Sequence, residues 1–253
     1  MAQPELPRWL KWFIDHAPAF LLPSLTPDPQ PSERQYVRSF MIMRIGSGLL
    51  AFLLPLLLVG IGWWLDDDSV PLGSLSEYYY SGAREVFVGV LCALAVFLLA
   101  YKVIELSLEN ILSMLAAALV VVVVAFPTGA PRRISDLTPL QEELGESFVE
   151  TVHFLAAAAF IGALAVISFF FGVREARRAQ SGKLSPAFWR RWHFGCAVAI
   201  VVAIVWILAT LRADWAPDNA LFYGEVVAVW AFAASWLTKG FEYHYLFREP
   251  ATR

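Results

Sequence analysis

Long apolar stretches recur along the chain, and short polar segments separate them. They cover residues 40–65, 84–102, 108–126, 148–173, 193–211 and 221–239. Each stretch approaches or exceeds the ~20 residues that an α-helix needs to cross the ~30 Å hydrocarbon layer of a bilayer. None alternates apolar and polar residues as a membrane β-strand does, and backbone groups in lipid must be paired within the segment. The pattern therefore predicts an all-α, polytopic membrane helix bundle of about six transmembrane helices.

The composition agrees with this class. Hydrophobic residues make up 58% of the 253 residues and charged residues 16%, against about 25% charged residues in soluble domains. The net charge of −3 is too small to indicate nucleic-acid binding. Cys92 and Cys196 both lie in apolar stretches and form no disulfide framework. We therefore expect membrane lipids as partners, and no nucleic acid.

The distribution of positive charge predicts how the bundle is oriented. With six spans, fifteen of the 19 Lys and Arg residues lie on the side that holds both chain ends, and four lie on the other side. Cytoplasmic loops are enriched in Lys and Arg, so both termini are predicted to be cytoplasmic. The first stretch starts too late, and is too long, to be a cleaved signal peptide. We expect a multi-pass protein of the cell's inner (plasma) membrane.

The chain divides into three predicted parts. Residues 1–39 combine an apolar and basic segment, typical of a cytoplasmic interfacial helix, with a Pro-rich linker. Residues 40–240 form the transmembrane domain, and residues 241–253 form a short cytoplasmic tail. In the longest outer loop, Thr138 is positioned to cap a short helix that starts at Pro139.

A polar block at residues 74–85, between the first two spans, is the strongest candidate for a site. It offers charge, hydrogen bonding and aromatic surface at one depth on the outer face. Arg84 starts the second span, where a cation opposes the helix dipole. We therefore expect it to have an acidic partner, or to hold a phosphate or carboxylate headgroup. The predicted binding residues of the outer face are Glu77, Tyr78, Tyr79, Tyr80, Arg84, Asp136 and Arg212.

Two ionisable residues inside the spans, His153 and Glu225, are candidate catalytic groups. Glu225 precedes Lys239 at the inner boundary by fourteen residues, which places it about 9 Å below the outer surface. His153 lies about two turns inside the fourth span and could exchange a proton near neutral pH. Intramembrane charges are commonly paired whether or not they act. Two interpretations of His153 and Glu225 therefore stay open: they belong to a polar site, or they pair with neighbouring helices for structural reasons.

The remaining polar residues indicate no metal or cofactor site. His153 belongs to the outer half, whereas His193 and His244 belong to the inner half, which separates them by nearly the bilayer thickness. Motifs such as HExxH, Gly-x-Ser-x-Gly and the P-loop are missing from the sequence. His193, at the membrane edge, needs no special role. Glu109 is expected to pair locally with residues of the tight inner turn at 102–109.

The segments Ser-Leu-Ser-Glu-Tyr-Tyr-Tyr-Ser-Gly-Ala-Arg-Glu-Val-Phe-Val-Gly (74–89), Ala-Phe-Pro-Thr (125–128) and Ser-Trp-Leu-Thr-Lys-Gly (235–240) resemble a family of bacterial six-helix integral membrane proteins. The resemblance covers most of residues 40–240. It implies a shared fold in the bacterial inner membrane. That family has no assigned activity, so the resemblance implies no reaction.

Three functions compete at this point. The first is a non-enzymatic membrane component that binds lipid or a membrane protein partner, and the sequence favours it. The second is a membrane-embedded enzyme acting on a lipid or lipid-linked substrate, with His153 as base and Arg84 on the headgroup. The third is a small-solute or proton-coupled carrier that uses Glu225. An enzyme requires these three side chains to converge around a cavity, whereas a scaffold predicts that they are paired separately.

Overall fold

The computed structural model describes residues 6–18, 34–66, 71–100, 108–131, 137–180, 187–212 and 216–246. Within these ranges the chain is helical and contains no strand, which confirms the all-α prediction. The elements are α1 (Arg8–His16), α2 (Arg34–Asp66), η3 (Ser76–Tyr80), α3 (Arg84–Ala100), α4 (Leu108–Ala125), α5 (Pro139–Leu144), α6 (Glu146–Gln180), α7 (Ala187–Thr210) and α8 (Ala220–Leu246).

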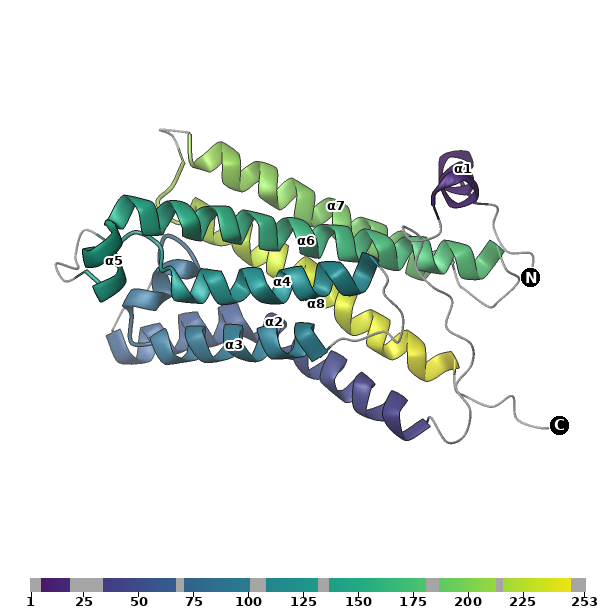
Figure 1. The fold of residues 1–253 in the computed structure, drawn as a ribbon, viewed down its shortest axis with the longest axis horizontal. Helices are drawn as coiled ribbons and strands as arrows, with labels where there is room; N and C mark the ends of the chain where they lie inside the picture. Colours follow the sequence, from purple (N-terminus) through teal and green to yellow (C-terminus); the bar gives the residue numbers. More distant parts are fainter. Residues whose placement is uncertain are drawn as a thin grey trace.

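The long helices form a membrane-type bundle. Five described helices, α2, α4, α6, α7 and α8, are long and apolar enough to cross a bilayer. The helix expected as the second span, α3, has 17 residues and lies between α2 and α4 along the same direction (Figure 1). The chain is therefore a helical membrane bundle. α2 already begins at Arg34 and α6 continues to Gln180, because helix formation does not stop where a stretch becomes polar.

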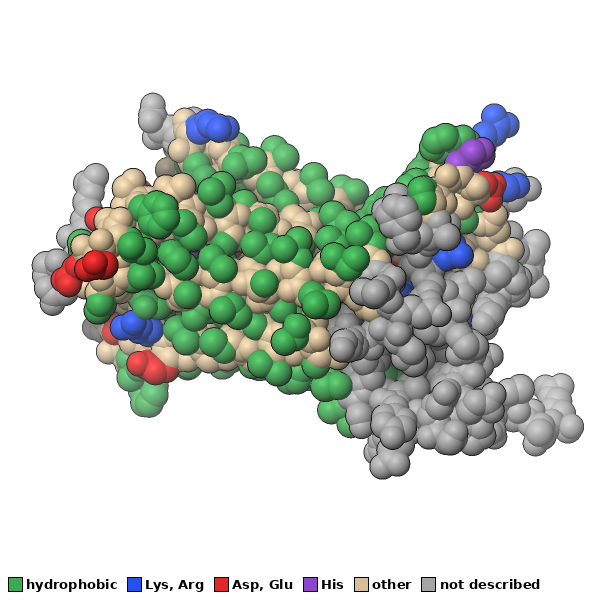
Figure 2. All heavy atoms as spheres, viewed as in Figure 1, with side chains coloured by type: hydrophobic (Ala, Val, Ile, Leu, Met, Phe, Trp, Pro, Cys, Tyr) green, Lys and Arg blue, Asp and Glu red, His purple; other side chains and the backbone are tan. Residues whose placement is uncertain are grey.

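The helices close into a ring. α3 contacts α2 and α4, α4 contacts α6, α6 contacts α7, α7 contacts α8, and α8 contacts α2. Figure 1 shows that η3 and α5 lie at one end of this ring and α1 at the other. We name these the α5 end and the α1 end. Figure 2 shows charged side chains towards both ends and mainly hydrophobic ones between them, as expected of a surface that faces lipid.

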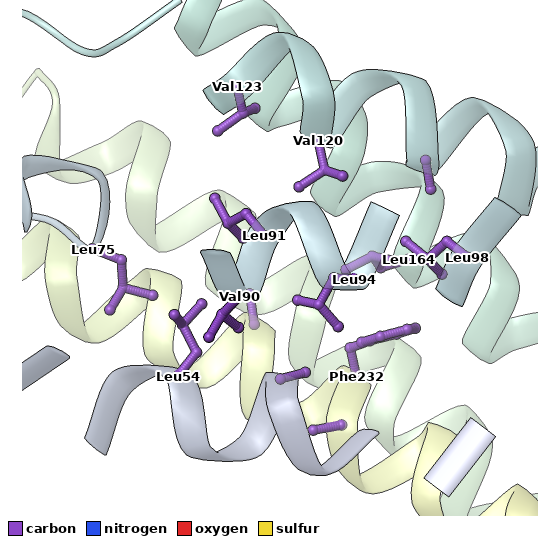
Figure 3. Packing of buried hydrophobic residues seen from close by; sticks show 14 of the residues in the cluster. Leu54, Leu75, Val90, Leu91, Leu94, Leu98, Val120, Val123, Leu164 and Phe232 are labelled. Atoms are coloured by element: carbon purple, nitrogen blue, oxygen red, sulfur yellow. The ribbon is translucent and has the colours of Figure 1, made fainter. Parts of the chain in front are cut away.

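Apolar side chains fill the ring. Leu54 of α2, Val90 and Leu94 of α3, Val120 of α4 and Phe232 of α8 belong to one buried cluster (Figure 3). The buried residues of α3 recur every three or four positions, so one face of that helix is directed at its neighbours. Since lipid is as apolar as this core, close packing rather than exclusion of water holds the helices together.

Candidate functional site

The polar block of residues 74–85 forms η3, its flanking turns and the first two residues of α3 at the α5 end, and contacts with α8 position it. The Leu75 amide donates a hydrogen bond to Glu225 Oε2 at 2.6 Å. The Gly73 amide donates to Glu77 Oε2 at 2.8 Å, and the Phe222 amide donates to the Gly73 carbonyl at 2.9 Å. Both candidate carboxylates therefore bind backbone amides of the loop that precedes η3.

The three tyrosines of the block have different surroundings. Tyr78 is 2% exposed and packs against Phe222 with ring centroids 6.4 Å apart. The Tyr80 hydroxyl donates to the Thr128 carbonyl at 2.7 Å and accepts a hydrogen bond from Gln141 Nε2 at 2.8 Å. Burial raises the pKa of Tyr80, and the bond from Gln141 opposes this rise. Tyr78 and Tyr80 therefore position η3 in the bundle.

The short helix α5 forms as predicted. Thr138 is its N-cap, and its hydroxyl accepts a hydrogen bond from the Gln141 backbone amide. In turn, the Gln141 side-chain oxygen accepts a hydrogen bond from the Thr138 backbone amide, so both of these backbone amides are paired. Pro139 occupies the first position of the helix. Because Gln141 also reaches Tyr80, this capping box joins α5 to η3. The sequence analysis missed Gln141, although its position three residues after Thr138 was a signal for the capping box.

Arg84 lines a cavity of about 410 Å³ at the start of α3. Its side chain is exposed, its Nη2 donates to the Tyr79 hydroxyl at 2.7 Å, and its guanidinium carbon lies 4.3 Å from the Tyr79 ring centroid. Tyr79 in turn meets Tyr80 edge-to-face at 5.2 Å. The described lining contains no acidic side chain and consists of Tyr79, Tyr80, Ser81, Arg84, Leu137, Thr138 and Pro139.

A second cavity, of about 400 Å³, has the opposite charge. Glu77 and Asp218 contribute carboxylates, and the described lining contains no Lys or Arg. Its other lining residues are small, hydroxylic or apolar: Gly73, Ser74, Thr128, Gly129, Pro131, Thr210, Leu211, Ala216, Pro217, Ala220 and Leu221. The α5 end thus holds one basic and one acidic cavity, with no lining residue in common.

His153 lies away from both cavities. It is 1% exposed, and its Nδ1 donates to the Phe126 carbonyl at 2.7 Å, with the Val123 carbonyl at 3.2 Å. These carbonyls lie at the C-terminal end of α4, where backbone acceptors lack helical partners. The ring therefore ties α6 to the end of α4.

The predicted site residues do not form one cluster. Arg84 lines the basic cavity, whereas His153 and Glu225 line neither cavity. Arg212 is exposed at the end of α7 and also lines neither. Asp136 lies outside the described residues. Among the described residues, no three His, Cys, Asp or Glu side chains lie close enough to hold a metal ion.

The sequence analysis missed a buried polar layer at the α1 end. Glu109 pairs with Arg174 of α6, a partner that the sequence analysis did not anticipate; residues 102–107, with which it was expected to pair locally, lie outside the described residues. Glu175 pairs with Lys239 of α8, and all four side chains are mostly buried. A signal was available, since opposite charges occur near the same ends of neighbouring spans.

Two further groups belong to this layer. His193 is fully buried and its Nδ1 lies 2.9 Å from Ser235 Oγ, so it joins α7 to α8. The Arg44 guanidinium lies 4.8 Å from the Phe171 ring centroid and 4.9 Å from that of Trp236. These contacts join α2, α6, α7 and α8, and the cation–π contacts of Arg44 favour this helix arrangement.

Comparisons of the chain with models of protein families, with curated proteins and with solved structures found no match. The resemblance to bacterial six-helix membrane proteins stays a prediction.

Proposed function

We propose that this protein is a non-enzymatic component of the inner (plasma) membrane, with both chain ends in the cytoplasm, that binds the acidic headgroup of a membrane lipid. The site is the basic cavity around Arg84. A single observation carries the proposal: an exposed guanidinium is held against Tyr79 inside a cavity whose described lining contains no acid.

The chemistry of the cavity suits a phosphate-bearing headgroup. A planar guanidinium donates two parallel hydrogen bonds to phosphate oxygens. The N-terminus of α3 adds a partial positive charge at the same place. Ser81 and Thr138 also line the cavity, and their hydroxyl groups donate to the Tyr78 carbonyl and to Gln141 Oε1. The volume of about 410 Å³ lies within the range of small-molecule sites.

Stacking on Tyr79 prepares Arg84 for binding. The hydrogen bond and the ring contact restrict a long side chain that would otherwise lose conformational entropy when it captured a ligand. Arg84 hydrogen-bonds to a neutral phenol, and no carboxylate of the described residues forms a salt bridge with it. An anion can therefore approach Arg84 without displacing a salt bridge to any of the described residues.

The same geometry argues against the two alternatives. An enzyme with His153 as base needs that ring beside Arg84, but its Nδ1 faces the backbone at the end of α4. A carrier that uses Glu225 needs a carboxylate that is accessible in turn from the two sides of the membrane. Glu225 instead accepts a hydrogen bond from the Leu75 amide. Binding without chemistry is the function that these contacts support best.

Lipid titration of the purified protein in detergent tests the proposal. Native mass spectrometry or ligand-induced thermal stabilisation would compare phosphatidylglycerol with phosphatidylcholine for the wild type, R84Q and R212Q. A charge-assisted hydrogen bond contributes about 1.5–3 kcal/mol, so R84Q should weaken phosphatidylglycerol binding about ten- to a hundredfold. R212Q removes an exposed arginine from the same end without touching the cavity, and it should bind as the wild type does. Equal binding by R84Q and the wild type would contradict the proposal.

A further inference from the structure

The N-terminal helix α1 lies across the bundle rather than along it. In Figure 1 the spanning helices run roughly horizontally, whereas α1 is seen almost end-on at the α1 end. Leu10 and Ile14, one turn apart on α1, are buried against Val173 and Ala176 of α6. A helix that crosses the spanning helices in this way lies roughly parallel to the plane of the membrane.

The rotation of α1 about its own axis is defined by contacts on its two edges. On one edge, Phe13 meets Phe169 with ring centroids 6.3 Å apart, and Trp9 meets Phe194 of α7 at 5.8 Å. On the other edge, Asp15 accepts a hydrogen bond from Gln180 at 2.9 Å. Along α6, positions 169 and 180 are about 16 Å apart. The aromatic edge therefore faces the middle of the bundle, and the polar edge faces its end.

The depth of α1 matches the border of the hydrocarbon layer. The contact on α6 begins at Phe169, in the apolar part of that helix, and extends past Arg174, its first charged residue after the apolar run. Aromatic rings favour this interfacial depth. Phe188 and Trp192, at the start of the neighbouring α7, are also exposed and stacked on each other.

The free face of α1 combines aromatic and basic side chains. Trp9 is 55% exposed and Trp12 63% exposed, and Arg8 and Lys11 are exposed beside them. The acid of this helix, Asp15, is hydrogen-bonded to Gln180. Interfacial helices combine aromatic insertion with attraction between basic side chains and anionic lipid in the same way.

We infer that α1 is an in-plane membrane anchor that binds anionic lipid at the α1 end. Trp9 and Trp12 enter the interfacial layer, while Arg8 and Lys11 contact phosphate headgroups. Leu10 and Ile14 transmit this attachment to α6, which sets the depth of the whole bundle. The anchor lies at the opposite end from the cavity around Arg84 and does not depend on it.

Spin-label accessibility in the full chain tests the depth of each edge. With Cys92 and Cys196 replaced, a nitroxide is placed at residue 9 or residue 15, and the protein is reconstituted in vesicles. Oxygen, which concentrates in lipid, should reach the label at position 9 more readily than the label at position 15. A water-soluble nickel chelate should reach the label at position 15 more readily than the label at position 9. Circular dichroism verifies that both labelled proteins are folded. If the nickel chelate reaches position 9 as readily as position 15, the anchor is refuted and the face is free for a protein partner.

A second comparison tests the charge of the bound lipid. The label at position 9 should lie deeper in vesicles of phosphatidylcholine with phosphatidylglycerol than in phosphatidylcholine alone. R8Q/K11Q should abolish this difference, because each basic residue contributes about fivefold in affinity for an anionic surface. R191Q removes an exposed cation from α7 at the same end and should preserve the difference. An equal loss in R191Q would contradict binding by α1 itself, as would identical depths in the two lipids.

Discussion

Replacing Glu225 tests whether this carboxylate is a structural anchor. In Glu225→Leu the Leu75 amide loses its acceptor, which lies at 2.6 Å in the wild type. A partly buried amide left without an acceptor costs about 1–3 kcal/mol. For a chain of this size, 1 kcal/mol corresponds to about 2–4 °C in the unfolding temperature. We therefore expect Glu225→Leu to unfold about 3–10 °C below the wild type.

Glu225→Gln separates the hydrogen bond from the charge. The amide oxygen of glutamine can still accept from Leu75, so this variant should lose less than half as much stability as the leucine variant. Unfolding in detergent, followed by circular dichroism, measures both variants. Glu85→Gln changes an exposed carboxylate in the first turn of α3 and serves as the control. The anchor would be refuted if Glu225→Leu were as stable as the wild type, or if Glu225→Gln were equally destabilised.

Three further changes test other parts of the structure. Gly48→Ala should lower the unfolding temperature, because a Cβ at this position would lie 2.7 Å from a leucine side chain of α8. Gly60→Ala is the control and should not lower it, because the space around Gly60 is open. Equal unfolding temperatures for the two variants would contradict the close contact at Gly48. Lys239→Met should lower the unfolding temperature, because it removes the cation that pairs with the buried Glu175 carboxylate. Adding Glu175→Leu should recover part of this loss in the same unfolding assay. Burial raises the pKa of Tyr80 in the folded state, because it favours the neutral phenol. The neutral phenol therefore contributes to the stability of the fold below about pH 10, and this contribution is lost as the pH rises through the raised pKa. Alkaline titration of tyrosinate absorbance should accordingly lose a late-titrating component in Tyr80→Phe, and an unchanged late component would exclude this assignment.

Much of the architecture could be predicted because it depends on local sequence. The apolar stretches define helices of membrane length, since the backbone polar groups of a lipid-embedded helix must form hydrogen bonds within that helix. The cap of α5 was also predictable, because Thr138 and Gln141 are three residues apart and bond each other. The depth estimate indicated that Glu225 lies near the α5 end, and it does contact the loop there.

The partners of the polar side chains could not be predicted in the same way. Glu225 binds a backbone amide 150 positions away, and Glu109 pairs with Arg174, 65 positions away. Each residue along a helix turns the side-chain direction by about 100°, so a partner depends on the rotation and height of every helix in the ring. The sequence by itself thus established a membrane bundle and the polar block at 74–85. Long-range packing separated Arg84 from His153 and Glu225, because only the assembled helices determine which polar groups meet.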